Sequence, residues 1–270
     1  MQRRKEGKTV EDPENVVIVE LVQPHIARVV LNRPRVRNAI NGAVAQGLQA
    51  AADRIEADDE IWVAILASSS DLAFCAGADL AEISAGRADM LSTQRGGFAG
   101  FTRLPRKKPW IAAVKGAAFA GGFELCLSCD MIVAAEDARF GLPETKRGLV
   151  AAAGGIHRLP RAIPRNLALE MVATGDPIDG KRAASVGLVN RCVPAAEVDA
   201  EALRLAEAIA RNAPLAVRES LAIARLHAER PDLPLIDMAL EATERLSTTA
   251  DYAEGPRAFL EKREPQWTGS

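Results

Sequence analysis

The sequence has few aromatic residues, no long apolar run and almost no net charge, and each shortage excludes a class of protein. Aromatic residues make up 4% of the 270 positions, too few for a surface that stacks the bases of single-stranded nucleic acid. No stretch approaches the roughly 18 uninterrupted apolar residues that indicate a membrane-spanning helix. The 34 lysines and arginines nearly balance the 36 aspartates and glutamates, so the net charge of -2 predicts neither a nucleic-acid nor a membrane partner.

Cysteine is also scarce. Four cysteines are too few and too scattered for a disulfide framework, and they favour a reducing compartment. Cys126 and Cys129 have the spacing of a metal-binding or redox pair, but no second pair or histidine cluster completes such a site, so we expect buried thiols and no metal. The N-terminus is charged and does not resemble a secretory signal. These features predict a cytoplasmic protein.

What is present is an ordinary globular composition, with 48% hydrophobic and 26% charged residues, and a pattern of strands and helices. Apolar runs bounded by turn residues predict strands over 16–22, 26–31, 61–67, 110–114, 131–135, 138–140 and 188–193. Helical periodicity predicts helices over 41–57, 123–129, 154–162, 165–173, 179–185, 197–211, 214–229, 234–248 and 251–262. A loop of small residues is expected over 68–79, and residues 80–104 show only weak helical periodicity.

The alternation of strands and helices stops near residue 195, after which only helices are predicted. We therefore expect a solvated tail over 1–14, an α/β domain over 15–195 and an all-helical region over 196–270.

Two acidic residues stand in apolar surroundings where a carboxylate needs an explanation. Glu124 lies at the start of a short apolar helix, and Glu144 follows a strand in Phe-Gly-Leu-Pro-Glu. An unpaired carboxylate in such a place is costly as an ion and acquires a raised pKa. Two of them in one pocket would suit general acid–base catalysis near neutral pH. From spacing alone, a helix cap for Glu124 and a structural ion pair for Glu144 explain them equally well.

Two glycine-containing segments, 76–79 and 120–122, connect a buried strand to a helix. Small residues there let a ligand approach the backbone, and the free N–H groups at a helix start can donate to it. Two such N–H groups aimed at one carbonyl oxygen would form an oxyanion hole, whereas a tight turn without a ligand is the alternative. Neither segment has the spacing of a dinucleotide-binding or P-loop motif.

These segments belong to a series of short motifs that runs through the chain. They occupy residues 31–34, 38–39, 74–80, 108–116, 120–125, 129–130, 140–144, 153–155, 158–159, 174–175 and 187–189. In order and spacing, the series resembles the enoyl-CoA hydratase (crotonase) family over about residues 16–265. Residues 121–125, 140–144 and 258–263 resemble the carnitinyl-CoA dehydratase branch more loosely.

The resemblance implies an α/β fold, a crotonase-like spiral of ββα units followed by the all-helical C-terminal region. It also implies an acyl-CoA thioester as substrate, whose oxygen the N–H groups of Ala78 and Gly121 would hold. In hydratases of the family, the residues matching Glu124 and Glu144 activate water for attack at C3 and deliver a proton to C2. The implied reaction is hydration of a trans-2-enoyl-CoA, with coenzyme A as part of the substrate and no other cofactor.

The same resemblance implies further contacts and an assembly. Substrate or coenzyme A contacts are expected from Ala76, Gly77, Asp79, Leu80, Arg33 and Arg37. Phe259 and Lys262 resemble residues that reach the coenzyme A site of a neighbouring subunit, and a homotrimer or homohexamer is expected. A surface role explains the arginines equally well.

Some positions depart from the family pattern and leave the acyl group open. Ala151-Ala152 replaces a frequent Pro-Gly pair, Ala120 replaces a glycine, and Phe123 is bulky. A dehydratase or isomerase acting on a specialised acyl-CoA, or a non-catalytic CoA-binding protein, is therefore an alternative. The basic run Arg103, Arg106, Lys107 and Lys108 is expected to be a solvated loop rather than a phosphate contact. His157 is expected in packing or at the surface rather than as a catalytic base.

Overall fold

Two sheets and a small hairpin hold the strands of residues 15–270, the part of the chain that this computed structural model describes. The predicted tail over 1–14 lies outside the described residues. The six-stranded sheet has the order β1 (Val17–Gln23), β2 (Ile26–Leu31), β3 (Val63–Ser68), β7 (Trp110–Val114), β9 (Met131–Ala135) and β12 (Arg191–Val193). The four-stranded sheet has the order β11 (Ile178–Asp179), β10 (Arg139–Gly141), β8 (Ala117–Phe119) and β4 (Ala73–Cys75). β5 (Ser92–Thr93) and β6 (Gly97–Phe98) form the hairpin.

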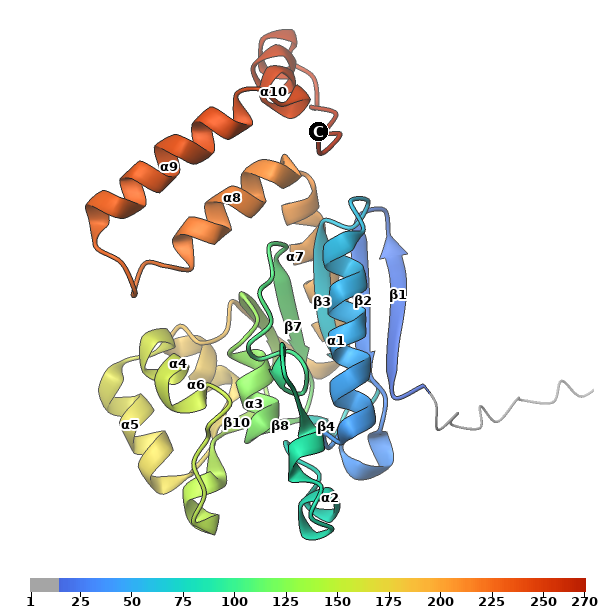
Figure 1. Cartoon of the computed structure of the whole chain (residues 1–270), viewed down its shortest axis with the longest axis vertical. Helices are drawn as coiled ribbons and strands as arrows, with labels where there is room; N and C mark the ends of the chain where they lie inside the picture. Colours follow the sequence, from blue (N-terminus) through green and yellow to red (C-terminus); the bar gives the residue numbers. More distant parts are fainter. Residues whose placement is uncertain (1–14) are drawn as a thin grey trace, which may run out of the picture.

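The helices follow the predicted order closely, as Figure 1 shows. They are α1 (Gly42–Ala57), α2 (Leu80–Ser84), α3 (Gly121–Cys126), α4 (Gly155–Ala162), α5 (Arg165–Thr174), α6 (Gly180–Ser185), α7 (Val198–Ala210), α8 (Pro214–Ala224), α9 (Asp232–Leu246) and α10 (Ala250–Glu261). Asn41 caps α1 at the expected start of this helix, because its Oδ1 accepts a 3.0 Å hydrogen bond from the N–H of Val44. Within the described residues, no helix is both long and apolar enough to span a membrane.

A repeated ββα path brings the ends of three strands to one edge of the four-stranded sheet. The chain passes from β3 to β4 and α2, from β7 to β8 and α3, and from β9 to β10 and a 3₁₀ helix, Pro143–Arg147. The first strand of each unit lies in the six-stranded sheet and the second in the four-stranded sheet. β8 pairs in parallel with both β4 and β10, so the carboxyl ends of all three strands meet at one edge. The expected spiral of ββα units is confirmed.

Several short elements differ from the sequence prediction. The expected loop over 68–79 contains β4, and the strand expected over 188–193 is shortened to β12. The weakly periodic segment 80–104 holds α2, a 3₁₀ turn and the β5–β6 hairpin. The second strands of the spiral are only three residues long and are defined by neighbours distant in sequence, so no local pattern marks them.

The C-terminal helices divide into one that packs on the sheet and three that extend from it. α7 packs against β3, β7 and β9, with Val198, Ala202 and Ala206 fully buried in the main core. α8, α9 and α10 lie beyond the end of the sheets in Figure 1. The expected division at residue 196 stays a prediction. α7 shares its core with the strands that precede it.

An arginine at the end of α8 binds the segments that precede β7 and β9. Arg225 binds both carboxylate oxygens of Asp130 at 2.7 and 2.8 Å, and it donates to the carbonyls of Arg106 and Lys108. Removing it would leave Asp130 without its ion-pair partner, with only the N–H of Trp110 still donating to it, and would take the donor from two carbonyls at a partly buried joint.

We expect Arg225→Ala to lower the free energy of unfolding by about 2–3 kcal/mol. Urea denaturation followed by circular dichroism measures this loss. Arg230→Ala, which removes an exposed arginine five residues along the chain, is the control with little expected effect. Equal stabilities of the two variants would contradict this role of Arg225.

Candidate active site

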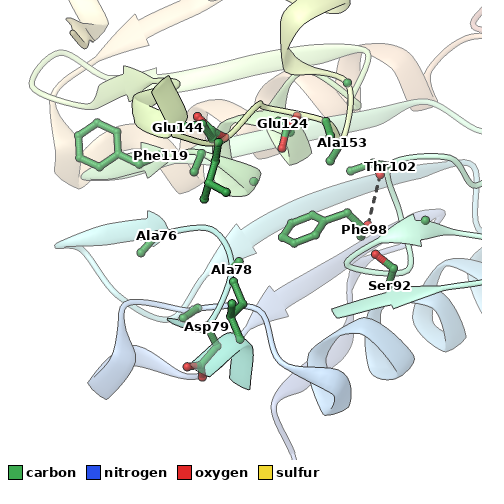
Figure 2. A pocket seen from close by; sticks show the side chains of 18 of the residues that line it. Ala76, Ala78, Asp79, Ser92, Phe98, Thr102, Phe119, Glu124, Glu144 and Ala153 are labelled. Carbon is green, nitrogen blue, oxygen red and sulfur yellow. Dashed lines mark hydrogen bonds between the residues drawn. The ribbon is translucent and has the colours of Figure 1, made fainter. Parts of the chain in front are cut away.

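A cavity of about 1410 Å³ opens at the edge where β4, β8 and β10 end. The segments that follow these strands supply Ala78, Gly121 and Glu144 to its wall, and α3 supplies Glu124. Figure 2 shows the two glutamates on one side of the cavity and Ala76, Ala78 and Asp79 on the other. The structure therefore brings together the acids and the glycine-containing segments singled out in the sequence.

The backbone N–H groups of Ala78 and Gly121 belong to residues that line the cavity, and their neighbours are held by hydrogen bonds. The N–H of Ile40 donates to the carbonyl of Gly77, and the N–H of Asp79 donates to the carbonyl of Ile40. These bonds fix both neighbours of Ala78, while the N–H groups of Ala78 and Gly121 donate to no other residue within 15–270. Two free donors at one cavity wall can hold a single carbonyl oxygen.

Glycine is needed where these segments meet. Gly77 has a φ of +92°, and a Cβ there would lie 2.9 Å from the Cβ of Ala120 and 3.1 Å from the backbone N of Gly121. A Cβ on Gly121 would overlap the ring of Phe98, and one on Gly122 would overlap the carbonyl of Cys75. The close approach of the two segments therefore depends on the absence of side chains.

Ala120 occupies a strained position at the start of α3. Its φ of 51° and ψ of -129° lie in a region that side-chain-bearing residues rarely adopt. Its N–H donates to the carbonyl of Gly141 at 3.0 Å, and its own carbonyl accepts from the N–H groups of Phe123 and Glu124. The surrounding hydrogen bonds hold the residue in this conformation beside the cavity.

Glu124 is a buried carboxylate that accepts hydrogen bonds from the backbone. Its residue is 3% exposed, and its Oε1 accepts a 2.8 Å hydrogen bond from the N–H of Gly155, the first residue of α4. Burial raises the pKa of Glu124 to about 7, the nearby Glu144 adds to the rise, and the Gly155 hydrogen bond opposes it. The carboxylate makes no side-chain cap for α3, so the cap interpretation is wrong.

Glu144 is held beside it with a free oxygen. The residue follows β10 in the 3₁₀ helix Pro143–Arg147 and is partly buried. Its Oε2 is buried without a hydrogen-bond partner in the described chain, and burial raises the pKa of the carboxyl group. No ion pair to Glu144 occurs among these residues, so the structural ion-pair interpretation is wrong as well.

Sequence reasoning gave no role to the residues that support Glu124. Arg158 lines the cavity and donates to the Ser128 hydroxyl at 2.8 Å and to the carbonyls of Ala153 and Thr102 at 3.2 and 2.6 Å. It thereby fixes the turn that presents the N–H of Gly155. The run 153–155 with Arg158 belongs to the family-like motifs, which is the signal that could have pointed to this role.

The other residues predicted to contact substrate or coenzyme A differ in whether they line the cavity. Ala76, Asp79, Leu80 and Arg37 line the cavity. Gly77 supports the wall through its backbone, as described above. The guanidinium of Arg33 binds Asp79 at 3.0 Å and the carbonyl of Ala39 at 2.5 Å, so it is engaged within the protein rather than at the cavity wall.

The two C-terminal candidates lie on α10, away from this cavity. Phe259 is 82% exposed, and Lys262 ends the helix with a left-handed backbone. Neither lines the cavity of its own chain. Their expected contact with a neighbouring subunit stays a prediction.

The basic run over 103–108 and the cysteines Cys126 and Cys129 can also be placed in the structure. The basic run is a solvated loop only in part. Arg103 and Lys107 are exposed as expected. Lys108 is 1% exposed and donates to the carbonyls of Ile55 and Asp58, and Arg106 packs over the ring of Phe101. Long side chains reach carbonyls that sequence patterns do not reveal. Cys126 is buried and Cys129 partly buried, both as free thiols.

The departures from the family pattern affect the cavity unequally. Phe123 points into the core against Phe140, with ring centroids 5.4 Å apart, so it does not shape the cavity. Ala120 and Ala152 do line it. His157 is exposed at the cavity wall, a surface position as expected.

Comparisons with known proteins agree with this geometry. A model of the enoyl-CoA hydratase/isomerase family matches residues 22–270. A carnitinyl-CoA dehydratase from Proteus mirabilis is 38% identical over 249 residues, covering 90% of this chain and 95% of that protein. A mevalonyl-coenzyme A hydratase from Aspergillus fumigatus is 37% identical over 257 residues, covering 94% of this chain and 95% of that protein.

A solved structure shares the fold over almost the whole chain. The crystal structure of an enoyl-CoA hydratase from Mycobacterium tuberculosis has a TM-score of 0.90 and 41% sequence identity, covering 96% of this chain and 100% of that one. Family match, identity and fold agree with the motifs that meet at the cavity. This chain is an enzyme of the enoyl-CoA hydratase/isomerase family, the crotonase family.

Proposed function

We propose that this enzyme adds water across the double bond of a trans-2-enoyl-CoA, with coenzyme A as part of the substrate and no other cofactor. The observation that carries the proposal is the pair of cavity carboxylates, Glu124 and Glu144, each with a raised pKa. A group that must give or take a proton near neutral pH needs such a pKa. A pair of them can serve both halves of an addition of water.

The two free backbone donors suit the thioester oxygen. As water adds at C3, negative charge develops on that oxygen in an enolate. The N–H groups of Ala78 and Gly121 would hold the charge without reorganising, because the surrounding backbone already fixes them. One donor of this type typically contributes about 10²–10³-fold in rate.

The environments of the two carboxylates suggest their roles. The hydrogen bond from Gly155 favours ionised Glu124, which would take a proton from water as the water oxygen attacks C3. The unpartnered Oε2 favours protonated Glu144, which would give its proton to C2. After this step Glu124 is protonated and Glu144 ionised, and one proton exchanged with solvent restores the starting state.

The same groups can catalyse dehydration of a 3-hydroxyacyl-CoA, because the steps are reversible. Two relatives are named for carnitinyl-CoA and mevalonyl-CoA, so similarity alone assigns no acyl group to this chain. Moving a double bond within the acyl chain requires one carboxylate to shuttle a proton. The presence of both favours hydration or dehydration over isomerisation.

Loss of the conjugated-enoyl absorbance of a short trans-2-enoyl-CoA tests the proposal. We expect purified protein to remove the absorbance rapidly and to form a product heavier by one water. A Glu124→Gln, Glu144→Gln double variant is the control and should remove none. Binding of the thioester without any absorbance loss by the wild type would contradict hydration and favour a non-catalytic CoA-binding role.

The pH dependence follows from the two carboxylates. Catalysis needs Glu124 ionised, so kcat/KM should fall about tenfold per pH unit on the acid side of a maximum set by the raised pKa values of the two carboxylates, of which that of Glu124 is about 7. It also needs Glu144 protonated, so kcat/KM should fall again above the raised pKa of that group. Initial rates across buffers of constant ionic strength measure the profile. A profile that stays flat down to about pH 5 would contradict Glu124 as the base.

We further propose a homotrimer or homohexamer, in keeping with the family resemblance. Large apolar side chains are exposed on the protruding helices: Leu233 at 73%, Leu240 at 65%, Phe259 at 82% and Leu260 at 80%. Exposed apolar groups of this size favour burial against another protein surface. In such an assembly Phe259 and Lys262 could approach a neighbouring site. A cytoplasmic location remains part of the proposal.

A further inference from the structure

One wall of the cavity carries an arginine that the proposed mechanism does not use. Arg103 follows the β5–β6 hairpin, and its backbone N–H donates to the carbonyl of Gly96 at 2.8 Å. Its stem crosses Gly97, where φ is +65° and a Cβ would lie 2.7 Å from the Cδ of Arg103. A side chain at position 97 would displace the stem, so this glycine sets the direction in which Arg103 faces the cavity.

The guanidinium of Arg103 has no partner in the described chain. No carboxylate lies within ion-pair distance of it there, and its side chain makes no hydrogen bond to these residues. Two nearby arginines differ: Arg95 pairs with Asp53, and Arg106 donates to backbone carbonyls. Arg103 is therefore a cation available to whatever occupies the cavity.

The other charges of the cavity do not neutralise it. Among the acids that line the cavity, Asp79 is paired with Arg33, and Glu124 and Glu144 have raised pKa values. Ser92 and Gln94 add polar groups to the wall that carries Arg103. An alkyl chain placed there would remove water from polar groups without replacing their hydrogen bonds.

The position of Arg103 relative to Glu124 and Glu144 indicates which part of a bound acyl chain it would contact. Arg158 joins the carbonyl of Ala153, beside the turn that holds Glu124, to the carbonyl of Thr102, the residue before Arg103. In Figure 2, Thr102 and Ala153 lie on the far side of Glu124 from Glu144. An acyl chain that starts at Ala78 and Gly121 and passes Glu124 at C3 continues toward this wall.

The opposite direction leads to a different set of residues. The carbonyl of Arg37 accepts from the N–H of Ala76, so Arg37 lies on the Ala78 side of the cavity, beside Asp79. Arg37 and Arg103 thus belong to different walls, and Arg147, a third arginine that lines the cavity, lies in the 3₁₀ helix that carries Glu144. Arg103 is the one that the acyl chain reaches beyond the double bond.

We propose that Arg103 determines specificity by binding a carboxylate at the distal end of the acyl chain, so that the substrates are 2-enoyl-CoA thioesters of dicarboxylic type. This inference rests on the proposed hydration and names its substrate class. A guanidinium binds a carboxylate through charge-assisted hydrogen bonds, which are stronger than neutral ones when water is displaced.

Two enoyl-CoA thioesters of equal length test the inference: trans-2-hexenoyl-CoA, with a terminal methyl group, and trans-2-hexenedioyl-CoA, with a terminal carboxylate. We expect the wild-type kcat/KM to be about tenfold or more higher for the carboxylate. Arg103→Gln should reduce this ratio to one or below, mainly through KM, and Arg103→Lys should restore part of it. Arg95→Gln makes the same change of charge outside the cavity wall and should leave the ratio unchanged.

Binding of the same thioesters to the Glu124→Gln, Glu144→Gln double variant, measured by calorimetry, separates this inference from the proposed reaction. Tighter binding of the carboxylate that disappears with Arg103→Gln supports the distal site even if neither thioester is hydrated, an outcome that overturns the hydration proposal alone. Hydration of both thioesters without a preference, or a preference unaffected by Arg103→Gln, overturns the distal site alone.

Discussion

Replacing Glu144 by glutamine should lower kcat for hydration by about 10³-fold, within the range of a lost general acid. Glutamine has nearly the same shape, so the 3₁₀ helix Pro143–Arg147 should persist, but its amide cannot deliver a proton to C2. KM should change little, because the carboxylate bonds to no other residue of the described chain: Oε2 has no partner, and the backbone hydrogen bond comes from Glu144 itself. Steady-state rates with a short trans-2-enoyl-CoA measure the effect.

A matched control is the same substitution at an exposed glutamate. Glu60→Gln changes the charge by the same amount at the surface, outside the cavity, and should leave kcat within twofold of the wild-type value. If Glu144→Gln also retained wild-type kcat, Glu144 would not be the acid. A loss confined to KM would instead indicate a binding role.

Glu124→Gln should lower kcat by a similar factor and, at the same time, stabilise the protein. The pKa of Glu124 is raised from 4.5 to about 7 in the folded chain, so the stability contributed by its protonated form is present below about pH 4.5 and lost as pH rises through 7. Glutamine carries no charge and avoids this loss. The gain at pH 8 has an upper value of roughly 3 kcal/mol.

Urea denaturation at pH 5 and pH 8 measures this stability difference, and the hydration assay measures the activity. We expect the variant to gain stability over the wild type at pH 8 and much less at pH 5. If the variant were inactive and also less stable than the wild type at pH 8, the ionised Glu124 would not be destabilising the folded protein. This result would contradict the view that the buried carboxylate is kept for catalysis at a cost in stability. The double variant should lose about as much kcat as either single one, since both groups act in one step.

The long elements could be predicted from the sequence because their signals are local. The cap at Asn41 and the apolar period of α1 act within a few residues, and the buried runs of β3 and β7 are continuous. The three-residue strand β4 carries no such signal. It exists because it pairs with β8, more than 40 residues along the chain.

The reactive side chains of the site could be predicted from the sequence, whereas the residues that hold them in place could not. Glu124 and Glu144 stand out because a carboxylate in apolar sequence is unusual, and the family resemblance then favoured catalysis over structural roles. The hydrogen bond from Gly155 and the carbonyls joined by Arg158 depend on segments about 30 to 56 residues apart that only the fold brings together. The burial of Lys108 was missed for the same reason: its side chain reaches carbonyls at the end of α1.

The central claim is that the paired glutamates add water, and the product formed in deuterium oxide tests it most directly. Nuclear magnetic resonance of the product from a short trans-2-enoyl-CoA should show a hydroxyl group at C3 and one deuterium at C2. The Glu124→Gln, Glu144→Gln double variant should give no such product. A 3-enoyl-CoA with deuterium at C2 and no hydroxyl group would contradict hydration and assign the cavity to double-bond isomerisation.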